Sequence, residues 1–356
     1  MKKVLALVLA LAMVMMMFVA CKKQEQNSSA DASKSGAQEP AKSYAMGYEK
    51  YDLACLYSEI TGDFWSIVYN GCTAALEELK AGSGVTGYCV APATSNDYTQ
   101  QMDLIETAKN KGVDGIVLCP SNADSIGTYV TDVFPDESIP IIVIDRSLNT
   151  TSPAVVATYA SDAYAMGEAQ AQMMHECYGD VELTYLNLGM SPENKNWADR
   201  SFGMIDYCKA NYPTYTNING DQPYWVGQVT QDITIQYIQD TVNSNPDKTL
   251  CIVATCNSYN NYAIAALSEL GEAGAKVGVM GWDFSKTEKA NIESGVMYGA
   301  MGQNPYLMGY DSTYMMCDFL AGKTIEKNAT VPYQVVTKNN LDSEEVQNYL
   351  KTMNLA

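Results

Sequence analysis

Short apolar runs alternate with longer segments of helical periodicity from residue 52 to residue 303. The runs are rich in β-branched residues and are apolar at consecutive positions, as expected for strands whose sheet is covered on both faces. Between them, apolar residues recur three or four positions apart, which predicts amphipathic helices. Strands are predicted at 52–58, 87–92, 114–120, 139–145, 154–160, 181–188, 249–256, 276–283 and 296–303, and helices at 64–80, 97–112, 197–211, 229–243 and 259–273. This order predicts an α/β protein with two doubly wound parallel-sheet lobes.

The strand predicted at 139–145 reads IPIIVID and runs directly into Arg146, so two opposite charges follow a buried segment. In open α/β sheets, ligands bind outside the carboxyl ends of the strands. Other predicted strands also end on polar or aromatic residues, namely Ser58, Asn257, Trp282, Asp283 and Gln303. Asp145 and Arg146 are therefore candidates for a ligand site, although a purely structural ion pair would produce the same dipeptide.

The first 47 residues do not follow this pattern. A lysine pair precedes an apolar run from Val4 to Ala20, and Cys21 follows in an ending that resembles a lipobox. The alternative interpretation is a membrane-spanning helix, for which the run is at the short limit. Residues 21–47 are rich in Ser, Ala, Gln and Lys and predict a flexible tether. We therefore expect a signal peptide at 1–20, lipidation of Cys21 and anchoring to the outer face of the cytoplasmic membrane.

The net charge limits the kinds of partner, and the length and the cysteine count bear on the fold. The net charge of −19 at pH 7 opposes nucleic acid and anionic lipid, and it weakly disfavours an anionic ligand. About 300 residues follow the tether, more than one hydrophobic core usually serves, which again predicts two lobes. Without Cys21, the odd number of remaining cysteines cannot all pair. Those in predicted strands are expected to act as small apolar side chains, although one disulfide remains possible.

The sequence contains partial matches to nucleotide-binding and metal-binding motifs, but their surroundings do not support either kind of site. GSGVTG at 82–87 matches G-x-G-x-x-G, but it follows a helix and precedes a strand, the reverse of the order in a dinucleotide site. His175 is the only histidine, so the spacing of a zinc protease is impossible, and no acid–base pair or nucleophile triad is obvious in the sequence. The chain is therefore not expected to be an enzyme or to need a metal or cofactor.

Residues 50–340 resemble the type I periplasmic sugar-binding proteins, including the ribose- and galactose/glucose-binding proteins. DFWSIVYNGCTAALEEL resembles the first helix of that family, and QQMDLIETAKNKGVDGIVLCPSNADSI resembles its Q-x-x-x-I-E-x-x-x-x-x-G-V-D-G-I segment. IPIIVIDR resembles the strand that ends in a sugar-gripping Asp-Arg pair. WADRSFGM, ATCNSYNNYAIAAL and VMGWDFSK resemble three further blocks of the family. The resemblance implies a hinge of three crossovers near residues 160, 303 and 332.

The resemblance also implies a set of ligand-binding residues. A sugar needs forked donors, carboxylate and amide acceptors, and flat aromatic rings for its C–H face. Arginines would donate, aspartates would accept through charge-assisted bonds, and aromatic rings would form stacking walls. The expected set is Ser58, Phe64, Trp65, Asp145, Arg146, Arg200, Trp225, Asn257, Trp282, Asp283 and Gln303. The first lobe is expected over 48–160 plus 304–331, and the second over 161–303 plus 332–356.

The function implied is that of a monomeric, lipid-anchored receptor that binds a monosaccharide or related polyol and delivers it to the permease subunits of an ABC importer. The alternative is a sensor of the same fold that signals to a chemoreceptor or histidine kinase. The sugar is left open, because Asp145 and Arg146 favour a ribose-like ligand and Trp225 favours a hexose. Cys119 departs from the family, which often has asparagine there. The calcium loop of the galactose/glucose-binding proteins has no counterpart near 179–182, so no structural calcium is expected.

Overall fold

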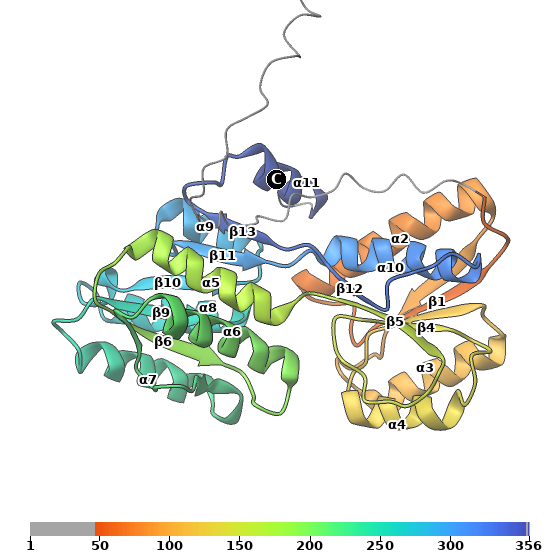
Figure 1. Cartoon of the computed structure of the whole chain (residues 1–356), viewed down its shortest axis with the longest axis horizontal. Helices are drawn as coiled ribbons and strands as arrows, with labels where there is room; N and C mark the ends of the chain where they lie inside the picture. Colours follow the sequence, from red (N-terminus) through yellow and green to blue (C-terminus); the bar gives the residue numbers. More distant parts are fainter. Residues whose placement is uncertain (1–46, 354, 356) are drawn as a thin grey trace, which may run out of the picture. The chain divides into compact units, whose positions relative to one another are not determined.

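The computed structural model describes residues 47–353 and residue 355, except for the side chains of Asp63 and Gln228. The predicted signal peptide, the lipidation site and nearly all of the tether lie outside these residues. Within the described part of the chain, no helix is both long enough and apolar enough to cross a membrane. The helices and strands form two separate sheets with covering helices (Figure 1).

The first sheet has the strand order β12-β5-β4-β3-β1-β2, and all of its neighbouring strands are parallel. Its strands are β1 (Asp52–Leu56), β2 (Thr86–Val90), β3 (Gly115–Leu118), β4 (Ile141–Ile144), β5 (Val155–Ala160) and β12 (Asn328–Thr330). The helices packed on it are α2 (Asp63–Ser83), α3 (Tyr98–Lys111), α4 (Ala123–Val133) and α10 (Pro305–Leu320). The strand order reverses between β1 and β3, which places a crevice at their carboxyl ends.

The second sheet repeats this order as β13-β11-β10-β9-β6-β7, with β8 beside β6. Its strands are β6 (Leu183–Gly189), β7 (Tyr215–Asn217), β8 (Tyr224–Trp225), β9 (Leu250–Ala254), β10 (Gly278–Trp282), β11 (Gly299–Gly302) and β13 (Gln334–Thr337). Its helices are α5 (Ala163–Tyr178), α6 (Lys195–Asn211), α7 (Gln231–Asn243), α8 (Asn257–Glu269), α9 (Lys286–Ser294) and α11 (Glu344–Thr352), with short 3-10 turns η1 (Val226–Gln228) and η2 (Gly274–Lys276).

One strand departs from the all-parallel expectation. β13 runs antiparallel to β11, because it enters directly from β12 of the first sheet without the crossover helix that joins parallel neighbours. The chain passes from one sheet to the other three times, after β5, after β11 and between β12 and β13. The doubly wound α/β fold with three crossovers is therefore confirmed.

Two buried glutamines hold the carboxyl ends of the central strands. Gln101 on α3 donates from Nε2 to the carbonyl groups of Tyr57 (3.1 Å) and Cys119 (2.8 Å), which follow β1 and β3. Gln170 on α5 donates to the carbonyl of Ala254 at the end of β9 (2.9 Å) and to a carbonyl of β10 (3.0 Å). Parallel strands leave such terminal carbonyls without ladder partners, and a buried carbonyl without a partner is costly. The glutamines thus stabilise the strand ends that carry the site.

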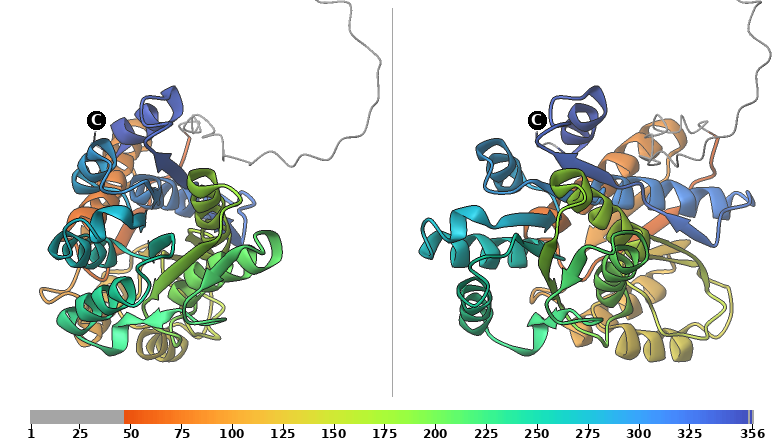
Figure 2. Two further views of the ribbon diagram at one scale, coloured as in Figure 1. Left: turned by 90° about the vertical axis from the view of Figure 1, so that its left-hand side faces the viewer. Right: turned by 60° about the vertical axis from the view of Figure 1, so that its left-hand side comes forward.

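Helices α2 and α10 lie side by side (Figures 1 and 2), and glycines permit their close approach. A Cβ atom at Gly71 would lie 2.1 Å from the carbonyl oxygen of Tyr306. We expect Gly71→Ala to lower the free energy of unfolding by about 2 kcal/mol, because backbone must move to relieve the overlap. Chemical denaturation measures this loss. Gly47→Ala is the control, since a Cβ at Gly47 meets nothing within 4 Å; equal stability of the two variants would contradict the prediction.

Candidate functional site

Three non-glycine residues have a left-handed backbone in the described chain: Asn96 (φ 59°), Asp145 (φ 60°) and Asp283 (φ 62°). Asp145 directly follows β4, Asp283 directly follows β10, and Asn96 lies in the loop after β2. This conformation costs a typical residue about 1–2 kcal/mol and is tolerated best by asparagine and aspartate. All three therefore combine a strained backbone with a polar side chain beyond the carboxyl end of a strand, a combination that often marks functional sites.

The turn at Asp145 explains why two charged residues follow a buried strand: the chain leaves the sheet there. The amide of Arg146 donates to the carbonyl of Ile144 (2.7 Å), so the chain leaves the sheet abruptly. Nη1 of Arg146 then donates to Oδ1 of Asn96 (2.6 Å) and to the carbonyl of Pro120 (3.5 Å). Its Nε lies 3.6 Å from the Asp145 carboxylate, a loose ion pair. The guanidinium is therefore positioned mainly by loops of neighbouring strands rather than by its sequence neighbour.

Trp65 on α2 completes the surroundings of Arg146. The centre of the guanidinium lies 5.5 Å from the centroid of the indole ring, within cation–π range. Phe64 packs edge-on against Trp65, with ring centroids 5.1 Å apart. An aromatic face and a cationic fork thus lie side by side at the crevice of the first sheet.

Arg200 is the corresponding cation at the second sheet. Its side chain is buried, and Nη1 donates to the carbonyl of Thr255 just after β9 (2.9 Å). The guanidinium lies 4.9 Å from the Trp282 ring centroid and 5.4 Å from that of Trp197. Its Nε is buried without a hydrogen-bond partner among the described residues. An acceptor from a ligand would remove the cost of that unpaired donor.

Asp145 feels charges from both sheets. Its side chain is only 11% exposed. Burial raises the pKa of Asp145, the guanidinium groups of Arg146 and Arg200 lower it, and the carboxylate of Asp283 raises it, with a net upward shift. The amide of Asn196 on α6 donates to the Asp145 carbonyl (3.2 Å). The four charged groups therefore form one electrostatic cluster of two cations and two anions.

Asp283 organises the second part of the site. Its carboxylate accepts from Nε2 of Gln303 (2.7 Å) and from the backbone amide of Asn257 (3.3 Å). Gln303 in turn accepts from Ser161 Oγ (2.9 Å), so residues next to two of the crossovers are joined here. The side chain of Asn257 does not cap its own helix but donates to Glu288 (2.7 Å). Asp283, Asn257 and Gln303 are thus one hydrogen-bonded group.

A cavity of about 360 Å³ opens between these groups, which is within the size range of small-molecule sites. Its lining includes five of the predicted ligand-binding residues, Phe64, Trp65, Asn257, Asp283 and Gln303. The remaining lining residues were not in the predicted ligand-binding set and are Glu59, Thr61, Gly62, Ile67, Ser258, Phe284, Ser285, Pro305 and Met353. The cavity therefore has walls from both α/β units, with aromatic rings on one wall and hydrogen-bonding groups on the other.

Two expected stacking walls need correction. Trp282 is 0% exposed and belongs to the core of the second sheet, so its ring supports Arg200 from beneath rather than facing the cavity. Trp225 pairs with β6 and packs edge-on against Phe202, with ring centroids 6.0 Å apart, and it does not line the cavity. Ser58 is also buried, beside the Cys119 thiol (3.9 Å). Asp145, Arg146 and Arg200 do not line this cavity, but Arg146 packs on Trp65, which does, and Asp145 interacts electrostatically with Asp283, which also does.

Sequence reasoning missed Asn96, Asn196 and Trp197. Trp197 had a usable signal, because it stands three positions before Arg200 on the predicted helix and therefore shares its face. Asn196 and Asn96 had none, since nothing in a loop or a first helical turn indicates which distant group an amide will contact. Their contacts with Asp145 and Arg146 depend on the tertiary fold.

Glu288 is a buried carboxylate that supports the site from behind. It is 0% exposed and accepts from the side chains of Asn257 and Asn260 and from the amide and hydroxyl of Ser285. We expect Glu288→Gln to lower the free energy of unfolding by about 2 kcal/mol, because the NH2 group of the new side chain would face the N–H and O–H groups that now donate to the carboxylate. Chemical denaturation tests this. Glu293→Gln, on the exposed side of α9, is the control, and an equally small effect of both changes would contradict the prediction.

Comparison with known proteins agrees with this geometry. The family model described as "Periplasmic binding protein domain" matches residues 54–324. The xylitol-binding protein of Mycolicibacterium smegmatis is 24% identical over 253 residues, covering 70% of this chain and 68% of the relative. The ribose import binding protein of Bacillus subtilis is 24% identical over 243 residues, covering 68% and 75%.

Solved structures share the fold over most of the chain. An ABC transporter solute-binding protein from Agrobacterium vitis with bound D-fucose superposes with a TM-score of 0.69 at 25% identity, covering 83% of this chain and 99% of that one. A carbohydrate transporter solute-binding protein from Agrobacterium radiobacter in complex with D-arabinose gives 0.69 at 22% identity, covering 84% and 98%. The chain therefore belongs to the periplasmic binding protein family, whose members are receptors and not enzymes.

Proposed function

We propose that this protein binds a monosaccharide or a closely related polyol at the crevice between its two α/β units and delivers it to an ABC importer. The observation that carries the proposal is that Asp145 and Arg146, after β4, lie close enough to Arg200 on α6 and Asp283 after β10 for the charges to influence one another. Such groups match the alternating donors and acceptors of a polyhydroxylated ligand. The relatives support the class of ligand, since their names specify xylitol, ribose and xylose.

Each part of the site has a role in this proposal. Arg146 and Arg200 donate to ring or hydroxyl oxygens, and Asp145 and Asp283 accept from hydroxyl groups. Trp65 and Phe64 cover the apolar C–H face. Asn257 and Gln303 both donate and accept. No acid–base chemistry is needed, because binding and release leave the sugar unchanged.

Transport requires that the importer distinguish loaded from empty receptor. We take the first lobe as 48–160 plus 304–331 and the second as 161–303 plus 332–356, with the three crossovers as hinge. A sugar that bonds to both lobes favours the closed state, and closure is the signal that a permease reads. The signal peptide at 1–20 and lipidation of Cys21 would hold the receptor at the membrane surface.

Calorimetric titration of the chain lacking residues 1–21 tests the proposal. The panel is ribose, xylose, arabinose, galactose, glucose, fucose, fructose, xylitol and myo-inositol. We expect saturable binding of one stereochemical group with a dissociation constant in the micromolar range or below. Uptake of that labelled ligand by cells with and without the gene then tests delivery. Failure of every sugar and polyol to bind would overturn the assignment of ligand class.

A further inference from the structure

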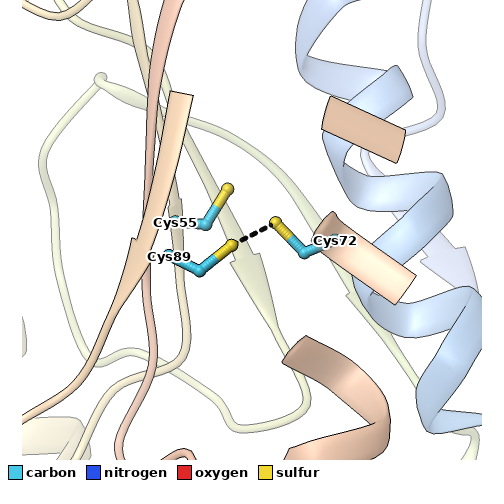
Figure 3. Close-up of side chains that lie close together, drawn as sticks. All are labelled: Cys55, Cys72 and Cys89. Carbon is cyan, nitrogen blue, oxygen red and sulfur yellow. Dashed lines mark hydrogen bonds between the residues drawn. The ribbon is translucent and has the colours of Figure 1, made fainter. Parts of the chain in front are cut away.

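Three cysteine side chains meet inside the first α/β unit, and none of them lines the cavity described above (Figure 3). Cys55 on β1 and Cys89 on β2 are partners in the parallel ladder, so their side chains lie next to each other. Cys72 on α2 points at them from the helix that covers this face. The three sulfur atoms lie within 4.8 Å of one another, and the sulfurs of Cys72 and Cys89 are 2.8 Å apart.

The surroundings differ among the three thiols. Cys55 and Cys72 are fully buried, whereas Cys89 is partly exposed because β2 is the edge strand of the sheet. Burial raises the pKa of Cys72, but the side chains of Cys55, Cys89, Thr313 and Tyr57 around it lower the pKa well below its ordinary value, whereas the pKa values of Cys55 and Cys89 are raised. The cluster thus combines one accessible sulfur, that of Cys89, with one buried sulfur, that of Cys72, whose pKa is lowered.

We propose that Cys72 and Cys89 form a reversible disulfide, with Cys55 as a neighbouring third thiol that stays reduced. The 2.8 Å contact is closer than two non-bonded sulfurs normally approach, and closing it to a covalent bond needs a shift of less than 1 Å. A disulfide between these two elements is neutral, so it suits the apolar core around it.

The oxidant is a small-molecule disulfide. Cys89 attacks one sulfur of the reagent because it is the accessible thiol, although contact with Cys72 and burial raise its pKa more than contact with Cys55 lowers it. The attack gives a mixed disulfide and releases one thiolate, which takes up the proton that Cys89 loses. The Cys72 thiolate then attacks the Cys89 sulfur, forming the Cys72–Cys89 bond and expelling the second small thiol with the proton from Cys72. Two protein thiols are oxidised by two electrons, and one reagent disulfide is reduced to two thiols.

The bond would join two elements that support the crevice. Helix α2 carries Trp65 near its start, and β2 leads into the loop that carries Asn96, the acceptor for Arg146. The disulfide would restrict the unfolded chain between Cys72 and Cys89 and thereby stabilise the fold. It would do so without involving any residue of the sugar site.

A thiophilic metal ion is the competing occupant. With metal–sulfur bonds of about 2.3 Å, three thiolates sit about 3.8 Å apart, so the Cys72–Cys89 contact would have to open rather than close. Three thiolates would also leave a net negative charge around a zinc or copper(I) ion inside an apolar core. The geometry therefore favours the disulfide.

The test compares the folded chain lacking residues 1–21 before and after treatment with oxidised glutathione, in a Cys177→Ser background that removes the exposed thiol. We expect the loss of two alkylatable thiols and a mass lower by two hydrogen atoms. A peptide linking Cys72 to Cys89 should appear in the non-reducing digest, and the thermal midpoint should rise by about 5 °C. Cys55→Ser should form the same link, and Cys89→Ser should form none.

Three outcomes would overturn the proposal. The first is that Cys72 and Cys89 both remain free after oxidation of the folded protein. The second is that Cys55 replaces either of them as the preferred partner. The third is that one equivalent of added zinc or copper(I) is retained in native mass spectra of the reduced protein and lost in Cys89→Ser, which would assign the cluster to a metal.

Discussion

Replacing Arg146 with alanine is expected to weaken sugar binding by about a hundredfold or more while the protein stays folded. The side chain is held by Asn96, Pro120 and Trp65, so it is preorganised for a ligand and loses little entropy on binding. Its removal deletes charge-assisted hydrogen bonds worth about 1.5–3 kcal/mol each and leaves the Asp145 carboxylate without its nearest cation. Calorimetric titration with the sugar identified by the panel measures the loss.

Two controls make this result specific. Arg146→Lys keeps the charge but cannot reproduce the planar fork, so we expect an intermediate loss of affinity. Lys248→Ala removes an exposed cation of the second α/β unit, near the start of β9, and should bind as the unaltered protein does. A dissociation constant for Arg146→Ala within threefold of that of Lys248→Ala would show that Arg146 does not contact the ligand.

The strands were predictable because a parallel sheet covered on both faces demands consecutive apolar residues. IPIIVID has the run of consecutive apolar residues that predicts such a strand, and the polar residue that follows it is expected at the crevice. The orientation of Trp282 was harder to predict, although it follows from the rule that side chains two positions apart in a strand lie on the same face of the sheet. Met280 and Trp282 are two positions apart in β10 and both point into the core, so the site begins only at Asp283.

The two α/β units share one structural feature, an aspartate with left-handed backbone directly after the corresponding strand. β4 and β10 hold corresponding positions in the two strand orders, and each is followed directly by an aspartate with left-handed backbone. The sequence shows both aspartates, at IIVID and MGWD, but cannot show that Asp145 and Asp283 lie close enough for their charges to interact. That depends on how the three crossovers bring the two sheets together, which is a tertiary property. The sequence therefore predicted which charged residues belong to the site, but it did not predict how they are arranged.

Asp145→Asn is expected to weaken sugar binding by roughly 10- to 100-fold, since a neutral amide oxygen accepts less strongly than a carboxylate. The same change should stabilise the ligand-free protein at neutral pH. Burial raises the pKa of Asp145 above its ordinary value, so the folded state holds this proton more tightly than the unfolded state does. Its contribution to stability is fully present below the ordinary pKa and is lost as pH rises through the folded pKa.

At pH 7 the ionised carboxylate therefore destabilises the empty fold, whereas an asparagine stays neutral and tolerates the left-handed backbone equally well. Chemical denaturation at pH 7 should show Asp145→Asn to be more stable than the unaltered protein, and the difference should shrink as the pH falls towards 4. Asp132→Asn, an exposed change on α4, is the control and should show neither effect. A variant that is less stable at pH 7, or that binds sugar as tightly as before, would contradict the argument. If both effects appear together, the ligand-free protein is carrying an unfavourable charge whose use is to bind the sugar.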